Sequence, residues 1–220
     1  MPIIEMILLM IIALILAAGE SLRFKQNKLL TEVQPQKKVI NYLIEYSHGS
    51  NLDNIVFVLG YSPELLINEL NNFKSTKIEY IINSEYKKGG MTSSIKTGLN
   101  FILTNHTQID AVLITPADIP FITTKIWNEI IDAFYVNNQQ FKIIIPTYEG
   151  KKGHPILLSR ELFPSIQNIS ENSQGLKAII SKYWDEILFL ELSYPGILFD
   201  IDDPKDLETL KQNIHKLTDS

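Results

Sequence analysis

The sequence contains no cysteine, and this absence removes several kinds of chemistry. Disulfide bonds, thiolate metal sites and a cysteine nucleophile are all excluded. There is no excess of positive charge either, because 20 Lys and Arg stand against 25 Asp and Glu, for a net charge of −5. Since nucleic-acid binding rests on a basic face, we expect no nucleic-acid partner, although a local cluster of cations still suffices for a nucleotide. The missing cysteines fit an intracellular protein, and we expect a cytoplasmic location.

The longest apolar run, Met6–Ala18, lacks the features of a targeting segment. No Lys or Arg precedes it, and it is shorter than the roughly 20 residues of a membrane-spanning helix. A signal peptide or anchor is the alternative, but a buried parallel strand with an apolar leader explains the run better. We therefore expect no membrane partner. A natural start at Met6 or Met10 would make residues 1–9 an N-terminal extension.

Apolar strand-like runs alternate with helical patterns along the chain. Strands are expected at Ile11–Leu16, Asn54–Leu59, Ile78–Ile82, Ala111–Thr115, Lys142–Thr147 and Ile187–Leu192. Helices are expected at Lys38–Ser47, Pro63–Asn72, Ser93–Asn105, Thr124–Val136, Glu161–Ile169, Gly175–Trp184 and Pro204–Lys216. This alternation predicts an α/β fold: a three-layer, Rossmann-like arrangement around a mostly parallel mixed sheet. We expect one domain over residues 1–220, with ligands at the carboxyl ends of the strands.

Neither of the two commonest phosphate-binding motifs, G-x-x-x-x-G-K-[ST] and G-x-G-x-x-G, is present. Instead, an apolar strand runs into Ala17-Ala18-Gly19, and Arg23 and Lys28 follow. Small residues expose backbone N–H groups to a polyphosphate, while arginine and lysine neutralise its charge. The segment therefore predicts a phosphate-binding loop; the alternative is a plain glycine turn with solvated cations.

A second candidate segment follows the run that ends near Asn83 and contains Gly89, Gly90 and Gly98. We expect Thr92 or Ser93 to cap the helix that begins there. Backbone groups and hydroxyls in this turn are suited to hydrogen-bond a base and ribose. The alternative is a capped helix with a flexible entry.

Two acidic segments are candidates for metal binding. Asp118 follows an apolar strand, where a carboxylate facing a polyphosphate suits Mg²⁺, although an Asp before Pro120 also caps turns. Asp200 and Asp202 point the same way if their segment is extended, so either is a candidate second ligand. Asp203 and Asp206 are expected to cap and complement the last helix.

The turn Lys151-Lys152-Gly153-His154-Pro155 is a candidate site for an anionic second substrate. A single histidine in a turn is more often structural or exposed, so we assign it no acid–base role. Binding of the acceptor substrate is accordingly expected at Lys152, Gly153 and His154.

The ordered set of motifs resembles the molybdenum cofactor cytidylyltransferase family of MobA-like nucleotidyltransferases. The matching segments are LAAGESLRF (16–24), NKLL (27–30), N-x-x-Y-x-x-GGMTSSIKTGL (83–99), Asp118-Ile-Pro120, GHPILLSREL (153–162) and DIDDPKDLETL (200–210). The resemblance implies Mg²⁺-dependent transfer of CMP from CTP to molybdopterin-bound molybdenum cofactor, with release of pyrophosphate, and a molybdoenzyme as a candidate maturation partner. Ala18 implies cytidine over guanosine.

The resemblance also implies roles for individual residues. Nucleotide binding maps onto Leu16, Ala17, Ala18, Gly19, Arg23, Lys28, Asn83, Gly90, Thr92, Ser93 and Ser94. Catalytic roles map onto Arg23, Lys28 and Asp118, and metal binding onto Asp118 with Asp200 or Asp202. Two alternatives stay open. One is another cytidylyl- or nucleotidyltransferase acting on a sugar phosphate or polyol phosphate, and the other is a non-catalytic nucleotide- or cofactor-binding protein of the same fold.

Overall fold

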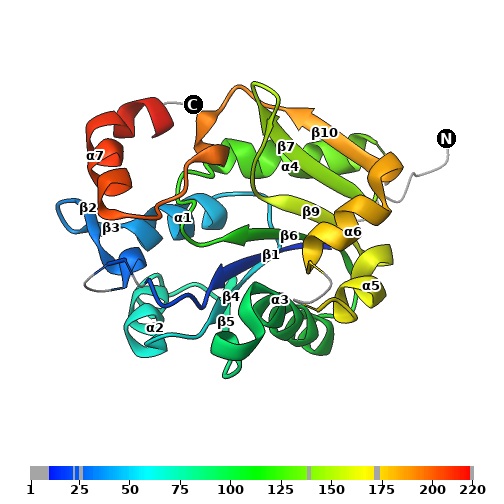
Figure 1. The fold of residues 1–220 in the computed structure, drawn as a ribbon, viewed down its shortest axis with the longest axis horizontal. Helices are drawn as coiled ribbons and strands as arrows, with labels where there is room; N and C mark the ends of the chain where they lie inside the picture. Colours follow the sequence, from blue (N-terminus) through cyan, green and yellow to red (C-terminus); the bar gives the residue numbers. More distant parts are fainter. Residues whose placement is uncertain (1–9, 22, 25–26, 138–139, 171–173, 219–220) are drawn as a thin grey trace.

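The computed structural model describes residues 10–21, 23–24, 27–137, 140–170 and 174–218. The proposed N-terminal extension therefore lies outside the described residues. The main sheet has eight strands in the order β10-β7-β9-β6-β1-β4-β5, and β8 pairs with β7 (Figure 1). These strands are β1 (Met10–Ala17), β4 (Asn54–Leu59), β5 (Ile78–Ile82), β6 (Ile109–Pro116), β7 (Ile143–Tyr148), β8 (Lys151–Lys152), β9 (Ile156–Ser159) and β10 (Ile187–Glu191). A separate two-stranded sheet joins β2 (Glu32–Gln34) to β3 (Lys37–Lys38).

The main sheet is mostly parallel, as the alternating pattern predicts. Strand β1 pairs in parallel with β4 and β6, β4 with β5, and β7 with β10. Strand β9 is antiparallel to both β6 and β7, and the short β8 is antiparallel to β7. Sequence reasoning did not assign β9 because four buried residues are too short to show a periodicity. The sheet is therefore mixed, and the antiparallel β9 lies in its interior, not at an edge.

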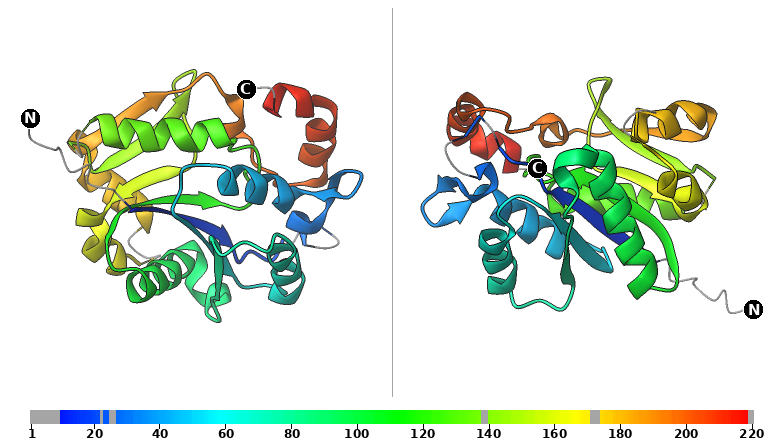
Figure 2. Two further views of the ribbon diagram at one scale, coloured as in Figure 1. Left: turned by 180° about the vertical axis from the view of Figure 1, so that it is seen from behind. Right: turned by 60° about the horizontal axis from the view of Figure 1, so that its bottom comes forward.

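Helices cover both faces of the sheet and give three layers (Figure 2). The apolar side chains of β1 alternate between the two cores: Ile11, Ala13 and Ile15 face one cluster, and Ile12 and Leu14 face the other. The first cluster packs against α1 (Val39–His48), α2 (Pro63–Asn72), α4 (Thr124–Val136) and α7 (Pro204–Thr218). The second packs against α3 (Tyr86–Asn105), α5 (Phe163–Gln167) and α6 (Leu176–Lys182). The predicted three-layer fold is confirmed.

Most predicted helices agree with the structure within a few residues, but α3 differs at its start. The helix begins at Tyr86 and is interrupted at Gly90, whose φ of 54° and ψ of −152° are not helical. A φ in this range favours glycine. Gly90 therefore precedes the regular part of α3, and Thr92 and Ser93 lie in its first turn. The expectation that Thr92 or Ser93 caps this helix is wrong.

Two other predicted helices are shorter than expected. The range Glu161–Ile169 contains a 3₁₀ turn, η2 (Arg160–Leu162), followed by the five residues of α5. The range Gly175–Trp184 contains α6 and the start of another 3₁₀ turn, η4 (Trp184–Glu186). Two further 3₁₀ turns are η1 (Lys28–Leu30) and η5 (Pro195–Leu198). Among the described residues, no helix is long and apolar enough to cross a membrane.

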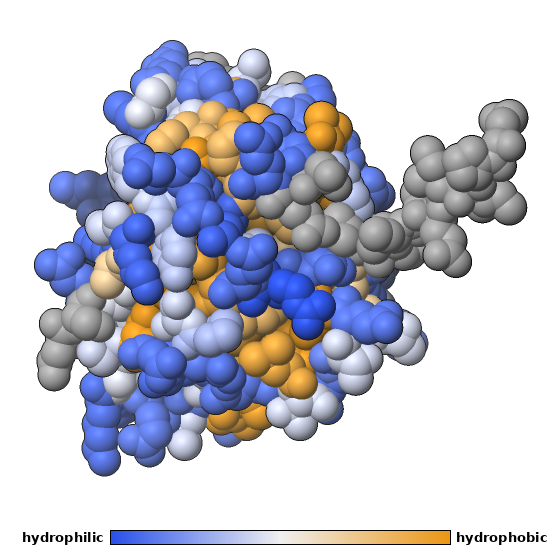
Figure 3. Space-filling view, turned by 90° about the vertical axis from the view of Figure 1, so that its right-hand side faces the viewer, coloured by the Kyte–Doolittle hydropathy of each residue, from blue (hydrophilic) through white to orange (hydrophobic). Residues whose placement is uncertain are grey.

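The two ends of the parallel strands differ in their surroundings. Strands β1 and β6 point toward the side of the molecule where β2, β3 and α7 lie (Figure 1). The opposite side is mainly hydrophilic, with scattered hydrophobic groups (Figure 3). The carboxyl ends of β1 and β6 thus lie together on the side of the molecule that carries α7. Parallel sheets bind their ligands at the carboxyl ends of the strands.

Candidate active site

A cavity of about 660 Å³ lies at the carboxyl ends of β1 and β6. The loops after these strands form two of its walls, the start of α3 a third, and the segment before α7 contributes an acidic side chain. The lining residues are Leu16, Ala17, Ala18, Gly19, Glu20, Ser21, Arg23, Lys28, Leu29, Tyr86, Lys87, Gly90, Met91, Ser94, Pro116, Ala117, Asp118 and Asp202. The cavity thus brings together parts of four of the five segments that sequence reasoning selected: the loop after β1, the Gly90 segment and the two acidic segments.

Gly19 lies in the loop after β1 and is exposed to the cavity. A Cβ placed on Gly19 would meet no heavy atom within 4 Å. The fold itself therefore has space for a larger residue at this position. The benefit of glycine here is instead the close approach of a ligand to the backbone.

This geometry predicts that Gly19→Ala leaves stability unchanged but weakens nucleotide binding. We expect the unfolding midpoint to stay at the wild-type value, because the new methyl group contacts nothing in the free protein. We expect the Kd for CTP to rise about tenfold, a cost of about 1.4 kcal/mol, because the methyl group occupies ligand space. Thermal unfolding and calorimetric titration measure the two quantities; unchanged affinity would show that no ligand approaches Gly19 closely.

Lys28 lies at the centre of the charged groups in the cavity. Asn27 positions it, because the Asn27 side chain accepts a hydrogen bond from the Leu29 backbone N–H and caps η1. The Lys28 ammonium donates to a carboxylate oxygen of Asp118 at 2.7 Å and to the carbonyl oxygen of Ile201 at 2.7 Å. It also lies 3.7 Å from a carboxylate oxygen of Asp202. In the free protein, this ammonium therefore connects the acidic segment that carries Asp118 with the one that carries Asp202.

Arg23 is more exposed than Lys28 and interacts weakly. Its guanidinium lies 3.9 Å from an Asp202 carboxylate oxygen, and both side chains are more than half exposed. Such a pair contributes little to stability. Arg23 is therefore available to a ligand in the cavity.

The acidic groups surround the Lys28 ammonium. Asp118 is partly buried and follows β6, and its carbonyl oxygen accepts a hydrogen bond from the Ile201 N–H. Burial, and then repulsion by Asp202 and Asp118, raises the pKa of Asp200 above its ordinary value. Asp202 lines the cavity, whereas Asp200 is not among the lining residues. Of the two candidates for the second metal-binding carboxylate beside Asp118, the geometry favours Asp202.

Carboxylate oxygens are the ligands that Mg²⁺ prefers, and a positive charge already lies between Asp118 and Asp202. These two side chains therefore fit a divalent cation that takes further ligands from water or substrate. Within the part of the chain that the structure describes, no three His, Cys, Asp or Glu side chains converge closely enough to hold a metal ion. The set Asp118, Asp200 and Asp202 is thus not a preformed three-carboxylate site.

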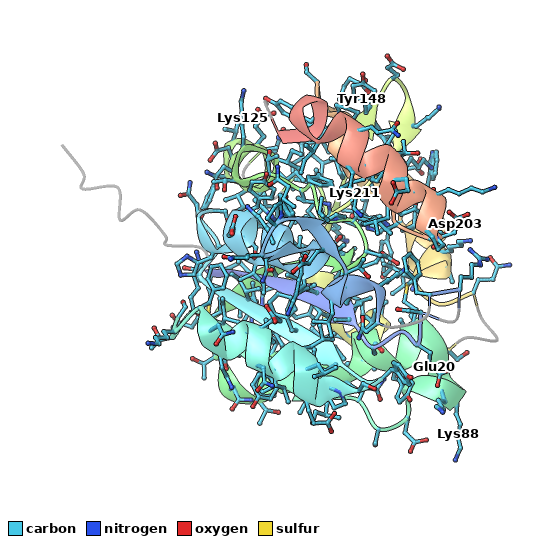
Figure 4. The ribbon with its side chains drawn as sticks, turned by 90° about the vertical axis from the view of Figure 1, so that its left-hand side faces the viewer. Glu20, Lys88, Lys125, Tyr148, Asp203 and Lys211 are labelled. Atoms are coloured by element: carbon cyan, nitrogen blue, oxygen red, sulfur yellow. The ribbon has the colours of Figure 1, made fainter. Side chains whose placement is uncertain are left out.

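Asp203 and Asp206 have a structural role at the beginning of α7. The Asp203 carboxylate accepts hydrogen bonds from the N–H groups of Lys205 and Asp206. The Asp206 carboxylate accepts in turn from those of Asp202 and Asp203. The predicted capping is confirmed. Figure 4 shows Asp203 at the start of α7, on the same side of the molecule as Glu20 in the loop after β1.

The predicted base-binding segment divides into two groups. Gly90 and Ser94 line the cavity, whereas Asn83, Thr92 and Ser93 are not among the lining residues. Asn83 is buried at the end of β5 and donates hydrogen bonds to the hydroxyl oxygens of Ser93 and Ser94. Asn83 therefore lies behind the wall that Ser94 presents to the cavity.

The turn predicted to bind the acceptor substrate lies outside the cavity lining. The Lys152 ammonium lies over the rings of Trp184 and Phe189, at 4.4 and 5.1 Å from their centroids. Gly153 packs against Ile197, and the His154 N–H donates to the Ile197 carbonyl oxygen. The segment that carries Asp200 and Asp202 begins shortly after Ile197. The charges of Asp118 and Asp200 act on the His154 imidazole and raise its pKa, against the larger effect of burial.

His154 is expected to make stability dependent on pH below neutrality. Burial lowers the pKa of His154 below its ordinary 6.5, although a backbone hydrogen bond with Ile114 and the charges of Asp118 and Asp200 oppose the shift. Below pH 6.5 the unfolded chain binds the proton more readily than the folded chain, so stability falls as pH decreases toward the folded pKa. Unfolding midpoints across pH 5–8 should fall less in His154→Gln than in wild type. His48→Gln, at an exposed histidine, is the control and should follow wild type; the same slope in His154→Gln would contradict the assignment.

Residues 13–187 match the MobA-like NTP transferase domain family. The chain belongs to this family. It is therefore a nucleotidyltransferase, and the cavity at the carboxyl ends of β1 and β6 is the candidate active site of a MobA-like domain.

Two curated relatives of the MobA-like chain are cytidylyltransferases. The chain is 27% identical over 200 residues to the molybdenum cofactor cytidylyltransferase of Escherichia coli (strain K12), covering 90% of this chain and 94% of the relative. It is 32% identical over 116 residues to the CTP:phosphoglutamine cytidylyltransferase of Campylobacter jejuni, covering 50% of this chain and 44% of the relative.

A solved structure confirms the fold of the MobA-like domain. Rv0371c from Mycobacterium tuberculosis H37Rv superposes with a TM-score of 0.75 at 17% identity, over 93% of this chain and 98% of that chain. A second structure of that protein is a complex with manganese, with a TM-score of 0.68 at 17% identity over the same shares. One protein of this fold, Rv0371c, has therefore been crystallised with a divalent metal.

Sequence reasoning missed one group of residues in the MobA-like site. The Lys87 ammonium pairs with a Glu20 carboxylate oxygen at 2.9 Å, and the Tyr86 hydroxyl lies 3.5 Å from the same oxygen. These contacts join the loop after β1 to the start of α3 across the cavity. The signal in the sequence was that Tyr86 and Lys87 stand three and two residues before the Gly89-Gly90 pair.

Proposed function

We propose that this nucleotidyltransferase transfers CMP from CTP to molybdopterin-bound molybdenum cofactor and releases pyrophosphate, with Mg²⁺ as the metal. One observation supports the proposal most strongly: a small-residue loop, two cations and two carboxylates meet in a single cavity. The similarity to the Escherichia coli enzyme over 90% of this chain supports the choice of acceptor. Ala18, in the loop after β1, supports cytidine.

The chemistry requires no covalent intermediate on the protein. An oxygen of the acceptor's terminal phosphate forms a bond to the α-phosphorus of CTP, the bond to the bridging oxygen breaks, and pyrophosphate leaves with that electron pair. Lys28 and Arg23 hold the triphosphate and offset the charge that grows on the leaving group. Asp118 and Asp202 would hold Mg²⁺, which supplies further positive charge beside the phosphate oxygens.

The Lys28 contacts imply a change when nucleotide binds. In the free protein the ammonium compensates Asp118 and Asp202 and holds the Ile201 carbonyl oxygen. With a divalent cation held by Asp118 and Asp202, these carboxylates would no longer need the ammonium. The Lys28 side chain would then be free to bind the phosphates of the leaving group. Nucleotide and metal are therefore expected to strengthen each other's binding.

The acceptor side is a separate part of the proposal. We propose that the turn containing Lys152, Gly153 and His154 contributes to acceptor binding, since His154 lies within electrostatic range of Asp118. The 32% identity to a cytidylyltransferase named for phosphoglutamine supports a second candidate, CMP transfer to a different phosphorylated acceptor.

Pyrophosphate release with a panel of acceptors distinguishes these candidates. With CTP and Mg²⁺, we expect release with molybdopterin and none with sugar phosphates, polyol phosphates or phosphoglutamine. Pyrophosphate release with a different acceptor alone would show that the protein transfers CMP to that compound and not to molybdopterin. Tight CTP binding without release for any acceptor would instead favour a non-catalytic binding protein.

A further inference from the structure

Asn83 connects the end of β5 to the cavity wall although it does not touch the cavity. Its side chain is buried, with 3% exposure, and its backbone N–H donates to the Leu59 carbonyl oxygen at 2.8 Å. The side-chain Nδ2 donates to the Ser93 hydroxyl oxygen at 2.8 Å and to the Ser94 hydroxyl oxygen at 3.0 Å. One amide group thus binds two consecutive hydroxyls of α3.

The orientation of this amide follows from its third contact. The Asn83 Oδ1 accepts a hydrogen bond from the backbone N–H of Glu85 at 3.0 Å. A reversed amide would place its NH₂ group against that N–H, two donors facing each other. Both hydrogens of Nδ2 therefore point to the serines, and both serine oxygens act as acceptors.

The two serines then differ in where their own hydroxyl hydrogens go. Ser93 donates to the Gly90 carbonyl oxygen at 2.9 Å. Ser94 is 3% exposed and lines the cavity, and its hydroxyl donates to none of the residues that the structure describes. The Ser94 oxygen already accepts a hydrogen bond from Asn83, so its hydroxyl hydrogen is left to donate. A ligand in the cavity would supply the acceptor for that hydrogen.

We propose that Asn83 is a positioning residue that fixes Ser94 as a hydrogen-bond donor to the nucleobase. A donor at this position selects an acceptor atom of the base, such as the carbonyl oxygen or ring nitrogen of cytosine, over an exocyclic amino group. This inference rests on the proposed function, because it assumes that a nucleotide occupies the cavity. It assigns the direction of one hydrogen bond, which the motif alone does not contain.

Asn83→Asp reverses that direction with almost no change in shape. The carboxylate still accepts from the Glu85 N–H, but its second oxygen now accepts from the Ser94 hydroxyl instead of donating to it. The Ser94 hydrogen is then no longer available to the base. We expect the Kd for CTP to rise about tenfold in Asn83→Asp, as in Ser94→Ala, since each loses one hydrogen bond to the ligand.

Two controls separate this role from a general structural one. Thr104→Ala removes another hydroxyl of α3, whose hydrogen is bonded to the Asn100 carbonyl oxygen, and should keep the Kd for CTP within about twofold of wild type. Inorganic triphosphate probes the phosphate end alone and should bind Asn83→Asp and Ser94→Ala as tightly as wild type. The double variant Asn83→Asp/Ser94→Ala should bind CTP no more weakly than Ser94→Ala, because both changes remove the same hydrogen bond.

Calorimetric titration of wild type and variants with CTP, GTP, ATP, UTP and inorganic triphosphate decides the matter. The proposal is supported if both single variants bind CTP more weakly than wild type and the double variant binds it no more weakly than Ser94→Ala. All variants should also bind inorganic triphosphate as tightly as wild type. Wild-type CTP affinity in Ser94→Ala, additive losses or equal loss of triphosphate binding overturns it. If Asn83→Asp does not fold, Ser94→Ala against Thr104→Ala decides. If wild type binds none of the four nucleotides, the proposed function fails and this inference fails with it.

Discussion

Asp118→Asn is expected to reduce Mg²⁺-dependent nucleotidyl transfer by at least about 10²-fold, because a metal ligand contributes several kcal/mol of charge stabilisation. The fold should be unchanged, since the amide keeps the shape of the carboxyl group and the backbone contact between Asp118 and Ile201 remains. CTP binding without metal should not weaken, because the variant releases Lys28 from its ion pair. The loss therefore belongs to turnover and not to nucleotide binding.

Asp110→Asn is the matched control for this variant. Asp110 lies on β6, is half-buried like Asp118, and accepts a hydrogen bond from the Met10 N–H at the opposite end of the strand from Asp118. The same chemical change there should leave turnover near the wild-type value. Steady-state pyrophosphate release at several Mg²⁺ concentrations measures both variants. Near-normal turnover of Asp118→Asn at limiting Mg²⁺ would remove Asp118 from the metal site.

Lys28→Ala is expected to weaken CTP binding by about 1.5–3 kcal/mol, or about 10- to 150-fold in Kd, the size of a charge-assisted hydrogen bond. Two effects act in the same direction. The triphosphate loses a cation, and Asp118 and Asp202 lose the ammonium that compensates them in the free protein. The uncompensated carboxylates then repel the nucleotide. Raising the Mg²⁺ concentration should restore part of the lost affinity.

Lys125→Ala provides a control with the same change in net charge. Lys125 is exposed on α4, and its ammonium lies 5.0 Å from the centroid of the Tyr194 ring (Figure 4). Its loss should leave CTP affinity at the wild-type value. Calorimetric titration with CTP at low and high Mg²⁺ compares the variants. Equal affinity in Lys28→Ala and wild type would contradict the assignment of Lys28 to the triphosphate.

The sequence predicted the layers of the fold, and it predicted that several segments of the candidate site meet at one edge of the sheet, for a physical reason. Strands β4 and β5 and helices α2 and α4 have the predicted bounds, because each is a long apolar or amphipathic run bounded by polar residues. Because parallel strands end at one edge, the loop after β1 and Asp118 had to lie close together.

The features that the sequence did not reveal depend on contacts between distant segments. The β9 strand is recognisable only by its pairing with β6 and β7. The preference for Asp202 over Asp200 depends on how the segment before α7 lies against Lys28. The Lys152 ammonium lies over the rings of Trp184 and Phe189, which are distant from it in the sequence. No local pattern contains these distances.

The most direct test of the proposed reaction follows the α-phosphate. CTP radiolabelled at that phosphate is incubated with the protein, Mg²⁺ and molybdopterin-bound molybdenum cofactor, and the acceptor is separated and counted. We predict that the label appears in the acceptor in a one-to-one ratio with released pyrophosphate, and that Asp118→Asn eliminates both. Label that stays in CTP, or leaves only as free CMP, with authentic acceptor present would contradict the account.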